Sequence, residues 1–332
     1  MTDNLSCQLP PHLQKGDLLR VIAPSGTLRE FETFQRGVEI WQQHGYRVEL
    51  PNNLDAREGY LAGTDSQRRQ QLLQAWRAPE CKGILCARGG YGCARLLEDW
   101  TWLLSEGDGK VGDGEEAGGD QLTFSYANIS SSPRKNLKWL IGFSDITCLL
   151  WSLRKIGISG VHGPVLTTLA TEPEWSLKRL FDCVEGRTLN TLSGKGWGGG
   201  KAIGSLLPAN LTVATHLLGT SVQPSLDGII LALEDVTEAP YRIDRMLTQW
   251  RMMGAFQAVR GIALGRFSRC YPPKDIPSWT VEEVLRDRLG DLGIPIVSDL
   301  PFGHDGVNAA LPVGQVVQLD AEQGNLSWKI EN

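Results

Sequence analysis

The sequence predicts an α/β protein of two domains, and three observations lead to this fold class. The chain has 332 residues, a length at which two domains are more common than one. Apolar residues make up 41% of it and charged residues 21%, which is typical of globular proteins. Short apolar runs alternate with amphipathic segments along the first half, and this order is typical of a mostly parallel, doubly wound sheet.

We predict four strands in the first half, each a short apolar run that ends at polar or turn residues. They are LLRVIAP (18–24), YRVEL (46–50), KGILCA (82–87) and WLIGF (139–143). Amphipathic segments between them predict helices over 30–45, over 64–78 with Thr64 or Asp65 as its cap, after RGGYG through Leu97, and from Ser144 to about Lys155.

The first of these helices illustrates the pattern. Phe31, Phe34, Val38 and Trp41 recur at helical spacing and predict one buried face, and Gly45 ends the helix.

The second half begins with a predicted helix over 173–186 and a glycine-rich linker over 192–202. The segments that follow predict strands at GIILALE, GIALGRF and IPIVSDL, helices over 240–254 and 281–289, and two final β segments, GQVVQLD and NLSWKIE.

An acidic, glycine-rich stretch over 105–132 interrupts the first half. It contains six acids and one lysine, so its net charge equals the −5 of the whole chain. Its low apolar content predicts a mobile surface insertion. The remainder is neutral overall and shows no basic stripe, so we expect no nucleic-acid partner.

The cysteines and the apolar runs of the chain indicate in which cellular compartment we expect the protein. The seven cysteines form no CxxC pair and several lie inside apolar runs, which predicts reduced core thiols and a cytoplasmic protein. We see no secretory signal and no apolar run long enough for a membrane span. The five histidines lack zinc-site spacing, so we expect no metal.

Polar residues of the types that a serine hydrolase needs follow three predicted strands. Ser144 follows WLIGF, Glu234 ends GIILALE, and His304 lies just beyond IPIVSDL. A serine becomes a nucleophile when an imidazole accepts its proton and an acid orients that imidazole. Spacing alone leaves alternatives open: Ser144 could simply cap a helix, and Asp235 and His162 compete as the acid and the base.

The segment ARGGYG (87–92) places glycines between a strand and a helix. Such glycines can present backbone N–H groups to an oxyanion, together with the N–H of Asp145. The spacing fits neither a dinucleotide-binding motif nor a phosphate-binding P-loop. A plain tight turn is the alternative.

Together, five stretches resemble the L,D-carboxypeptidases, serine peptidases of family S66 that include the microcin C immunity proteins. They are ARGGYGCARLL, IGFSDITCLL, HGP, LEDVTEAPYRIDRMLTQW and PFGHDGVNAALPVG, which occur in the family's order from about residue 18 to 314. The resemblance implies Ser144 as nucleophile in a G-[aromatic]-S-D-x-T elbow, Glu234 as acid and His304 as base. It also implies an oxyanion hole at the backbone of Gly90 and Asp145.

The same resemblance implies two domains with the site in the cleft between them. We expect a Rossmann-like N-terminal domain over 14–170 that carries the serine, a helix and linker over 171–200, and a smaller α/β C-terminal domain over 201–332. It further implies a homodimer, a muropeptide substrate and no cofactor. The insertion over 105–132 is the main departure from the family pattern and puts the size of the substrate in doubt.

The expected reaction is removal of the C-terminal D-alanine from murein tetrapeptides during cell-wall recycling. The carboxylate of such a substrate needs a cation, for which Arg88 is the candidate. Two other functions stay open: hydrolysis of peptidyl- or aminoacyl-adenylates, and muropeptide binding without catalysis.

Overall fold

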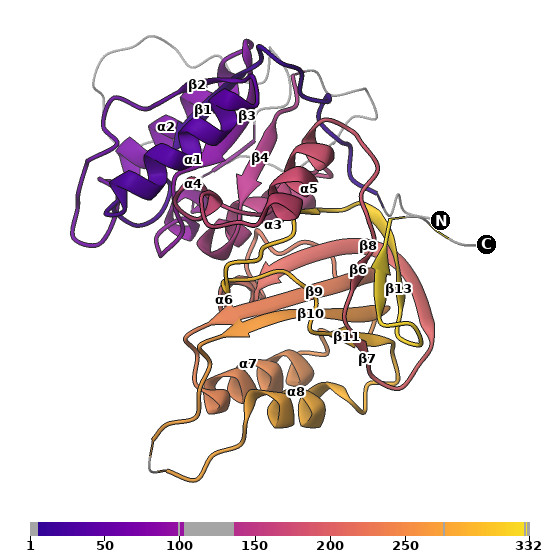
Figure 1. Cartoon of the computed structure of the whole chain (residues 1–332). Helices are drawn as coiled ribbons and strands as arrows, with labels where there is room; N and C mark the ends of the chain where they lie inside the picture. The colour runs from indigo at the N-terminus through magenta and orange to yellow at the C-terminus, as the bar shows by residue number, and fades with distance from the viewer. Residues whose placement is uncertain (1–5, 99, 103–135, 275, 329, 331–332) are drawn as a thin grey trace.

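The computed structural model describes residues 6–98, 100–102, 136–274, 276–328 and 330. In this part of the chain two sheets stand one above the other (Figure 1). The predicted insertion over 105–132 lies outside the described residues. No helix among the described residues is long and apolar enough to cross a membrane.

The first sheet has six strands in the order β12-β5-β4-β3-β1-β2, and all are parallel except β12. Its strands are β1 (Leu18–Ile22), β2 (Arg47–Glu49), β3 (Cys81–Cys86), β4 (Trp139–Gly142), β5 (Val161–His162) and β12 (Leu311–Pro312).

Helices cover both faces of this sheet. They are α1 (Phe31–Gln43), α2 (Asp65–Arg77), α3 (Thr147–Lys155), α4 (Leu166–Leu169) and α5 (Glu174–Val184), with short 3-10 helices η1 (Ala94–Leu97) and η2 (Ser144–Ile146). Buried side chains of α1, α4 and α5 form one core cluster with the sheet, and those of α2 and α3 form another. The first sheet is therefore doubly wound, as predicted.

The second sheet has eight strands in the order β6-β14-β13-β8-β9-β10-β11-β7. The four central strands β8 to β11 are parallel, and antiparallel strands complete both sides. The strands are β6 (Leu192–Ser193), β7 (Lys195–Gly196), β8 (Lys201–Asn210), β9 (Ile229–Val236), β10 (Gly261–Ser268), β11 (Ile296–Ser298), β13 (Val316–Asp320) and β14 (Asn325–Ser327).

Three helices accompany this sheet: α6 (Leu211–Leu217), α7 (Pro240–Met252) and α8 (Val281–Leu289). Helices α7 and α8 lie together beneath β9 and β10 in Figure 1. Most predicted elements are present with small shifts at their ends, and the predicted helix over 281–289 has the bounds that we expected.

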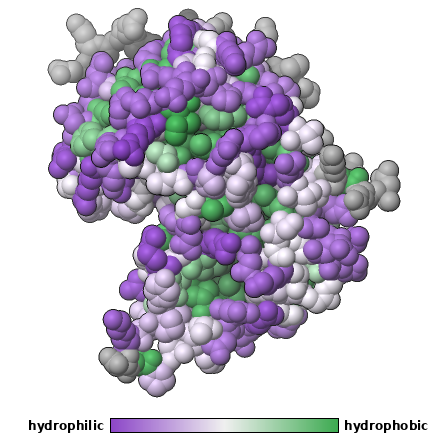
Figure 2. Space-filling view, viewed as in Figure 1, coloured by the Kyte–Doolittle hydropathy of each residue, from purple (hydrophilic) through white to green (hydrophobic). Residues whose placement is uncertain are grey.

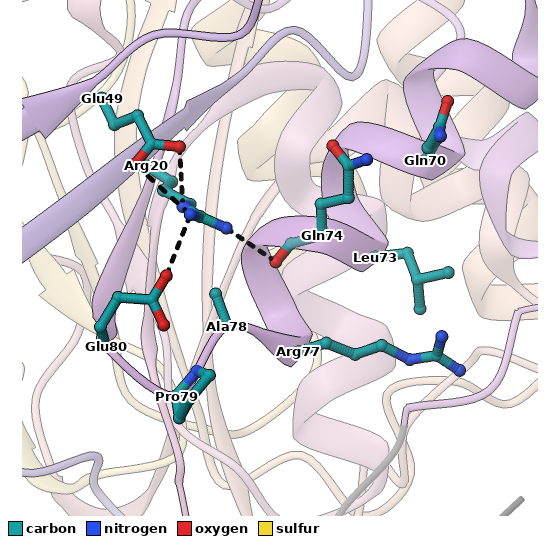
Figure 3. A pocket seen from close by; sticks show the side chains of 9 residues that line it. All are labelled: Arg20, Glu49, Gln70, Leu73, Gln74, Arg77, Ala78, Pro79 and Glu80. Atoms are coloured by element: carbon teal, nitrogen blue, oxygen red, sulfur yellow. Dashed lines mark hydrogen bonds and ion pairs between the residues drawn. The ribbon is translucent and has the colours of Figure 1, made fainter.

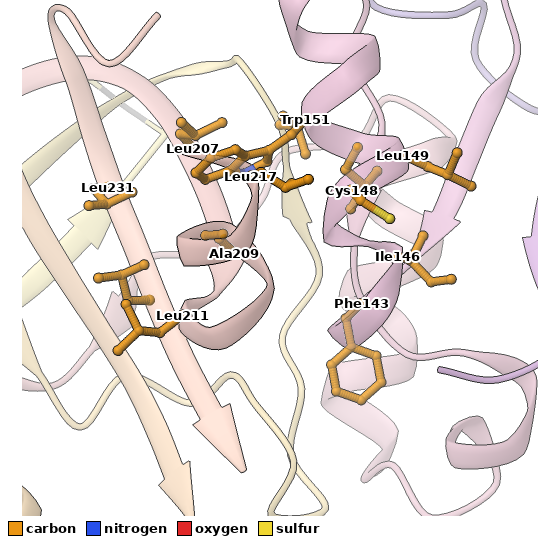
Figure 4. Close-up of a cluster of buried hydrophobic side chains, with 14 of the residues drawn as sticks. Phe143, Ile146, Cys148, Leu149, Trp151, Leu207, Ala209, Leu211, Leu217 and Leu231 are labelled. Atoms are coloured by element: carbon orange, nitrogen blue, oxygen red, sulfur yellow. The ribbon is translucent and has the colours of Figure 1, made fainter. Parts of the chain in front are cut away.

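A shared core joins the two halves. Seven of the nine residues of α3 are buried, as expected for a helix that is packed on all sides. Figure 4 shows α3 side chains such as Trp151 facing Leu207 on β8 and Leu217 on α6. The indole N–H of Trp151 donates to the Pro208 carbonyl at 3.2 Å. The segment after Ser144 is thereby fixed against the second sheet.

Several expectations differ from the structure. Phe31 is 47% exposed, and the buried face of α1 includes Gly37 instead, where a Cβ would collide with the backbone of Leu166. The segment after RGGYG forms only the short η1. The predicted linker contains β6 and β7, which pair with β14 and β11 in the second sheet. Strand β12 belongs to the first sheet although it lies within 201–332.

Candidate active site

Ser144 follows β4 in a strained backbone conformation. Its φ is +63°, in the left-handed region that costs a residue with a Cβ roughly 1–2 kcal/mol. Ser144 is not the N-cap residue of η2 or α3, and neither helix start has a side-chain cap. The helix-cap interpretation is therefore wrong. A serine on a strained turn between a strand and a helix is instead the geometry of a nucleophile elbow.

The residues around Ser144 explain this turn. A Cβ on Gly142 would lie 2.9 Å from Ile146 and 3.1 Å from the Cβ of Cys86, so only glycine fits there. Ile146 stands where many elbows have a second glycine, and it is fully buried against Gly142. At this position of the turn the chain therefore carries a buried isoleucine, and the close approach is made by Gly142.

Glu234 and His304 come together from different ends of the second half. Glu234, near the carboxyl end of β9, is completely buried. Its Oε2 lies 2.6 Å from Nδ1 of His304, whose side chain is 15% exposed. The carboxylate can hold the Nδ1 proton, which leaves Nε2 as the acceptor that a general base needs.

Phe143 brings the serine turn to the histidine. It directly precedes Ser144, and its ring centroid lies 4.6 Å from that of His304. Glu234 is thus in contact with His304, and the residue before Ser144 packs against the same imidazole. The outline of the molecule is indented between its two halves (Figure 2).

The competing acid, Asp235, faces elsewhere. Its Oδ2 accepts hydrogen bonds from the N–H and the hydroxyl of Thr212 at 2.8 and 2.7 Å. Burial and the neighbouring Glu234 raise the pKa of Asp235 to about 6. The contact with His304 is made by Glu234, so the geometry favours Glu234 as the acid.

The competing base, His162, is fully buried at the end of β5. Neither of its ring nitrogens has a hydrogen-bond partner among the described residues. Burial, and less strongly His304, lowers the pKa of His162 to about 3. This imidazole stays neutral at ordinary pH and contacts Phe143 and Phe302 edge-on.

The glycine turn after β3 lies against the serine. A Cβ on Gly89 would sit 3.1 Å from the Ser144 hydroxyl and 3.8 Å from the backbone nitrogen of Asp145. The Gly89 carbonyl accepts the N–H of Gly26 at 3.3 Å. Because the peptide is trans, the N–H of Gly90 points the opposite way from that carbonyl, and Gly90 itself has a φ of +117°.

The side chain of Asp145 is held by the segment that follows the glycine turn. Its Oδ2 accepts the N–H of Cys93 at 2.9 Å, a bond that joins the glycine turn to the elbow. Burial raises the pKa of its carboxyl. The two predicted oxyanion donors therefore belong to turns that are bonded to each other.

Arg88 lies at the same turn but is partly engaged. Its Nη1 donates to the Thr27 carbonyl at 2.5 Å and lies 3.6 Å from Glu30 Oε2. Both contacts use one nitrogen, and a guanidinium has five N–H donors. The side chain, 24% exposed, retains donors for a carboxylate.

Sequence reasoning did not identify Asn210, the N-cap of α6. Its amide nitrogen donates to Glu234 Oε1 at 3.3 Å and to Asp235 Oδ1 at 3.1 Å. Asn210 thus orients the carboxylate that contacts His304. An asparagine before LTVATHL is a cap signal, but nothing in the sequence links it to a glutamate 24 positions later.

A second network holds the loop of His304. Asn308 Oδ1 accepts the N–H of Gly303 at 3.2 Å, and the N–H of Asn308 donates to Glu172 Oε2 at 2.9 Å. Ser176 also donates to Glu172 Oε2, at 2.7 Å. Glu172 is 8% exposed, and burial raises its pKa. Sequence reasoning also missed this network because its members are far apart in the chain.

A pocket elsewhere in the first half contains none of these residues (Figure 3). Arg20 on β1 stands in it and pairs with Glu49 and Glu80 at 3.1 and 3.0 Å. Its guanidinium also donates to the Gln74 carbonyl at the end of α2. In this pocket the charge of Arg20 is therefore paired with the carboxylates of Glu49 and Glu80.

Known proteins resemble the chain along most of its length. The model of the LD-carboxypeptidase N-terminal domain matches residues 19–112, and that of the C-terminal domain matches residues 203–319. A Synechocystis protein named only as a carboxypeptidase is 56% identical over 96% of both chains. The murein tetrapeptide carboxypeptidase of Pseudomonas aeruginosa is 31% identical, over 93% of this chain and 94% of its own.

Solved structures of other proteins also resemble this chain along most of its length. The muramoyltetrapeptide carboxypeptidase from Oxalobacter formigenes has a TM-score of 0.76 at 27% identity, covering 93% of this chain and 97% of that one. The microcin C7 self-immunity protein in complex with aspartyl sulfamoyl adenosine has a TM-score of 0.78 at 20% identity, covering 98% and 99%; that likeness concerns the fold alone.

These matches confirm the α/β fold class and show that the chain belongs to the LD-carboxypeptidase family, peptidase family S66. The protein is a carboxypeptidase, and hence a hydrolase, as the resemblance in its sequence implied.

Proposed function

We propose that this carboxypeptidase hydrolyses the amide bond before the terminal D-alanine of murein tetrapeptides, with Ser144 as nucleophile. His304 takes the Ser144 proton through Nε2 as the hydroxyl attacks the scissile carbonyl. It then gives the proton to the leaving amine, and water resolves the acyl-enzyme by the same route. Glu234 holds Nδ1–H and stabilises the imidazolium.

The observation that supports this mechanism best is the 2.6 Å contact between Glu234 and His304 beside a serine at φ +63°. A buried carboxylate on Nδ1 fixes the tautomer of the imidazole, and the strained turn exposes a hydroxyl above the sheet. The competing residues have other surroundings: Thr212 binds Asp235, and burial keeps His162 neutral.

The N–H groups of Gly90 and Asp145 would bind the oxyanion of the tetrahedral intermediate. Each such donor contributes roughly 3–4 kcal/mol to transition-state stabilisation. Support comes from the glycine turn against Ser144 and from the bond between Asp145 and Cys93 that joins the two turns. Arg88 is the proposed cation for the substrate carboxylate.

The substrate class rests on relatives. The proteins named murein or muramoyl tetrapeptide carboxypeptidase are 31% and 27% identical to this chain. By analogy we propose a muropeptide substrate from cell-wall recycling. A cytoplasmic location, a homodimer and the predicted domain boundaries at 170 and 201 stay predictions, as does the absence of a cofactor.

A second candidate is hydrolysis of aminoacyl- or peptidyl-adenylates. Its support is the fold likeness to the microcin C7 self-immunity protein, at 20% identity. That likeness is weaker than the agreement in sequence with the tetrapeptide carboxypeptidases, so we favour the muropeptide. Binding without catalysis is disfavoured because the serine, glutamate and histidine are all present and Glu234 contacts His304.

Two substrates that differ in one stereocentre test the proposal. We expect the protein to release alanine from a murein tetrapeptide ending in D-alanine, and at least about 100-fold more slowly from its L-alanine diastereomer. Equal release from both would contradict L,D-specificity. Hydrolysis of an aminoacyl-adenylate with no action on either tetrapeptide would favour the second candidate.

A further inference from the structure

Two tyrosines with exposed rings stand beside the proposed oxyanion turn. Tyr60 is 60% exposed and Tyr91 is 54% exposed. Their ring centroids lie 5.7 Å apart and their planes are tilted by 59°. Tyrosine offers a large contact area at low cost in conformational entropy, so such pairs are typical of ligand-binding surfaces.

A tight hairpin presents Tyr60. The N–H groups of Glu58 and Leu61 donate to each other's carbonyls at 3.0 and 2.9 Å, which leaves a two-residue turn with Gly59 at φ +58°. This glycine permits the turn type that suits a short hairpin. The Tyr60 carbonyl accepts the N–H of Thr27 at 3.1 Å. Tyr60 therefore projects from a bonded loop.

Tyr91 projects from the glycine turn itself, directly after Gly90. The two loops are in contact, because a Cβ on Gly92 would collide with the side chain of Leu61. A Cβ on Gly90 would lie 3.4 Å from Gly26, whose neighbour Thr27 bonds Tyr60. Both rings are thus attached to the backbone that forms the proposed oxyanion site.

The tilt between the two rings indicates which kind of ligand they can contact. Rings tilted by 59° do not form the parallel slot that would sandwich a flat nucleobase. A puckered pyranose, with C–H groups on both faces, can contact the two rings at once. In a muramoyl tetrapeptide three residues separate the sugar from the scissile bond, and three α-linked residues span about 11 Å when fully extended. The sugar can therefore reach rings on the turns that flank Ser144.

We propose that Tyr60 and Tyr91 form a platform for the muramoyl sugar of the substrate, so that the enzyme prefers muramoyl tetrapeptide to the free tetrapeptide. This inference rests on the proposed function. The hydroxyl groups are not required, since the faces of the rings make the contact.

The test compares kcat/KM for N-acetylmuramoyl tetrapeptide and for the free tetrapeptide. We expect the wild type to prefer the muramoyl form, and Tyr60→Ala to lower the ratio of the two values by about tenfold. Tyr60→Phe and Tyr91→Phe should retain the ratio. Tyr271→Ala, which removes a ring that is 73% exposed in the second half, is the matched control and should also retain it.

A ratio that Tyr60→Ala and Tyr91→Ala leave unchanged would overturn the platform, as would equal losses on both substrates. Both results leave the proposed function intact, because the wild type would still release D-alanine. Failure of the wild type to cleave either substrate would instead overturn the proposed function. Calorimetry of muramoyl tripeptide with Ser144→Ala, with and without Tyr60→Ala, then tests the platform without catalysis. About tenfold weaker binding on loss of Tyr60 would support it, and equal binding would overturn it.

Discussion

Glu234 Oε2 and His304 Nδ1 lie 2.6 Å apart although 70 positions separate the two residues in the chain. The Glu234 carboxylate is fully buried on β9, whereas the His304 side chain is partly exposed. Asn210 holds the other carboxylate oxygen at 3.3 Å. This arrangement fixes which nitrogen of His304 can accept a proton.

Replacing the carboxylate by an amide tests that role. We expect Glu234→Gln to lower kcat by about 10³–10⁴, because the amide can favour the wrong tautomer and does not stabilise an imidazolium. Asp235→Asn is the matched control. Its side chain faces Thr212, so it should lower kcat by less than about tenfold. Steady-state kinetics that rank the two variants the other way would contradict the assignment.

The strain at Ser144 predicts an unusual order of stabilities. We expect Ser144→Gly to be at least as stable as Ser144→Ala, because φ is +63° and only a residue with a Cβ pays for this conformation. Inside a helix or strand with ordinary negative φ, glycine would instead lower the free energy of unfolding by roughly 0.5–1 kcal/mol relative to alanine. Urea denaturation of the two variants measures the difference. A clearly less stable Ser144→Gly would contradict the strained elbow.

The close approach of the glycine turn to the side chain of Ser144 can be tested by substitution. A methyl group on Gly89 would lie 3.0–3.1 Å from the side chain of Ser144, so we expect Gly89→Ala to displace the nucleophile and lower kcat by about 100-fold. Gly163→Ala is the control, since its Cβ would meet ordinary contacts at 3.4–3.5 Å. Circular dichroism checks that both variants fold. Equal kcat values for the two would show that this approach is unimportant.

The network behind the histidine loop should affect turnover more than binding. Glu172→Ala leaves the N–H of Asn308 and the hydroxyl of Ser176 without their acceptor. We expect kcat to fall about tenfold or more, with KM changed less than twofold. Glu172→Gln retains an acceptor oxygen and should recover most of the activity. If neither kcat nor KM changes in Glu172→Ala, the network does not position His304.

Burial of His162 predicts a dependence of stability on pH. Its pKa is lowered from 6.5 to about 3, so between these values the unfolded chain binds more protons than the folded one. The free energy of unfolding therefore falls as the pH drops below 6.5, and the loss from this group alone approaches about 4 kcal/mol near pH 3. His162→Leu should flatten this slope in chemical denaturation at pH 4 to 7. An unchanged slope would contradict the assignment of this pH dependence to His162.

The sequence predicted the elements that obey simple patterns. Strand β4 and helix α8 appear as apolar or amphipathic runs with clear ends. Strand β8 escaped prediction because Gly204 and Pro208 interrupt it, residues that usually disfavour strands. Its hydrogen bonds to β9 and β13 on either side determine the strand.

The residues of the candidate site likewise fall into those that the sequence predicts and those that it does not. Ser144, Glu234 and His304 could be proposed because each lies at or beyond the end of a predicted strand, in a family motif. Their competitors could not be rejected by spacing: Asp235 adjoins Glu234, consecutive side chains of a strand point to opposite faces, and only the placement of β9 decides which of the two faces His304. Asn210, Glu172 and Asn308 act through contacts between distant segments, which no local pattern encodes.

The most direct test of the central claim is release of D-alanine from a murein tetrapeptide, followed by mass spectrometry, with the wild type and Ser144→Ala side by side. We predict tripeptide and free D-alanine with the wild type, and essentially none with Ser144→Ala at unchanged thermal stability. Comparable release by both proteins would contradict Ser144 as the nucleophile. Failure of both to release D-alanine would contradict the proposed substrate.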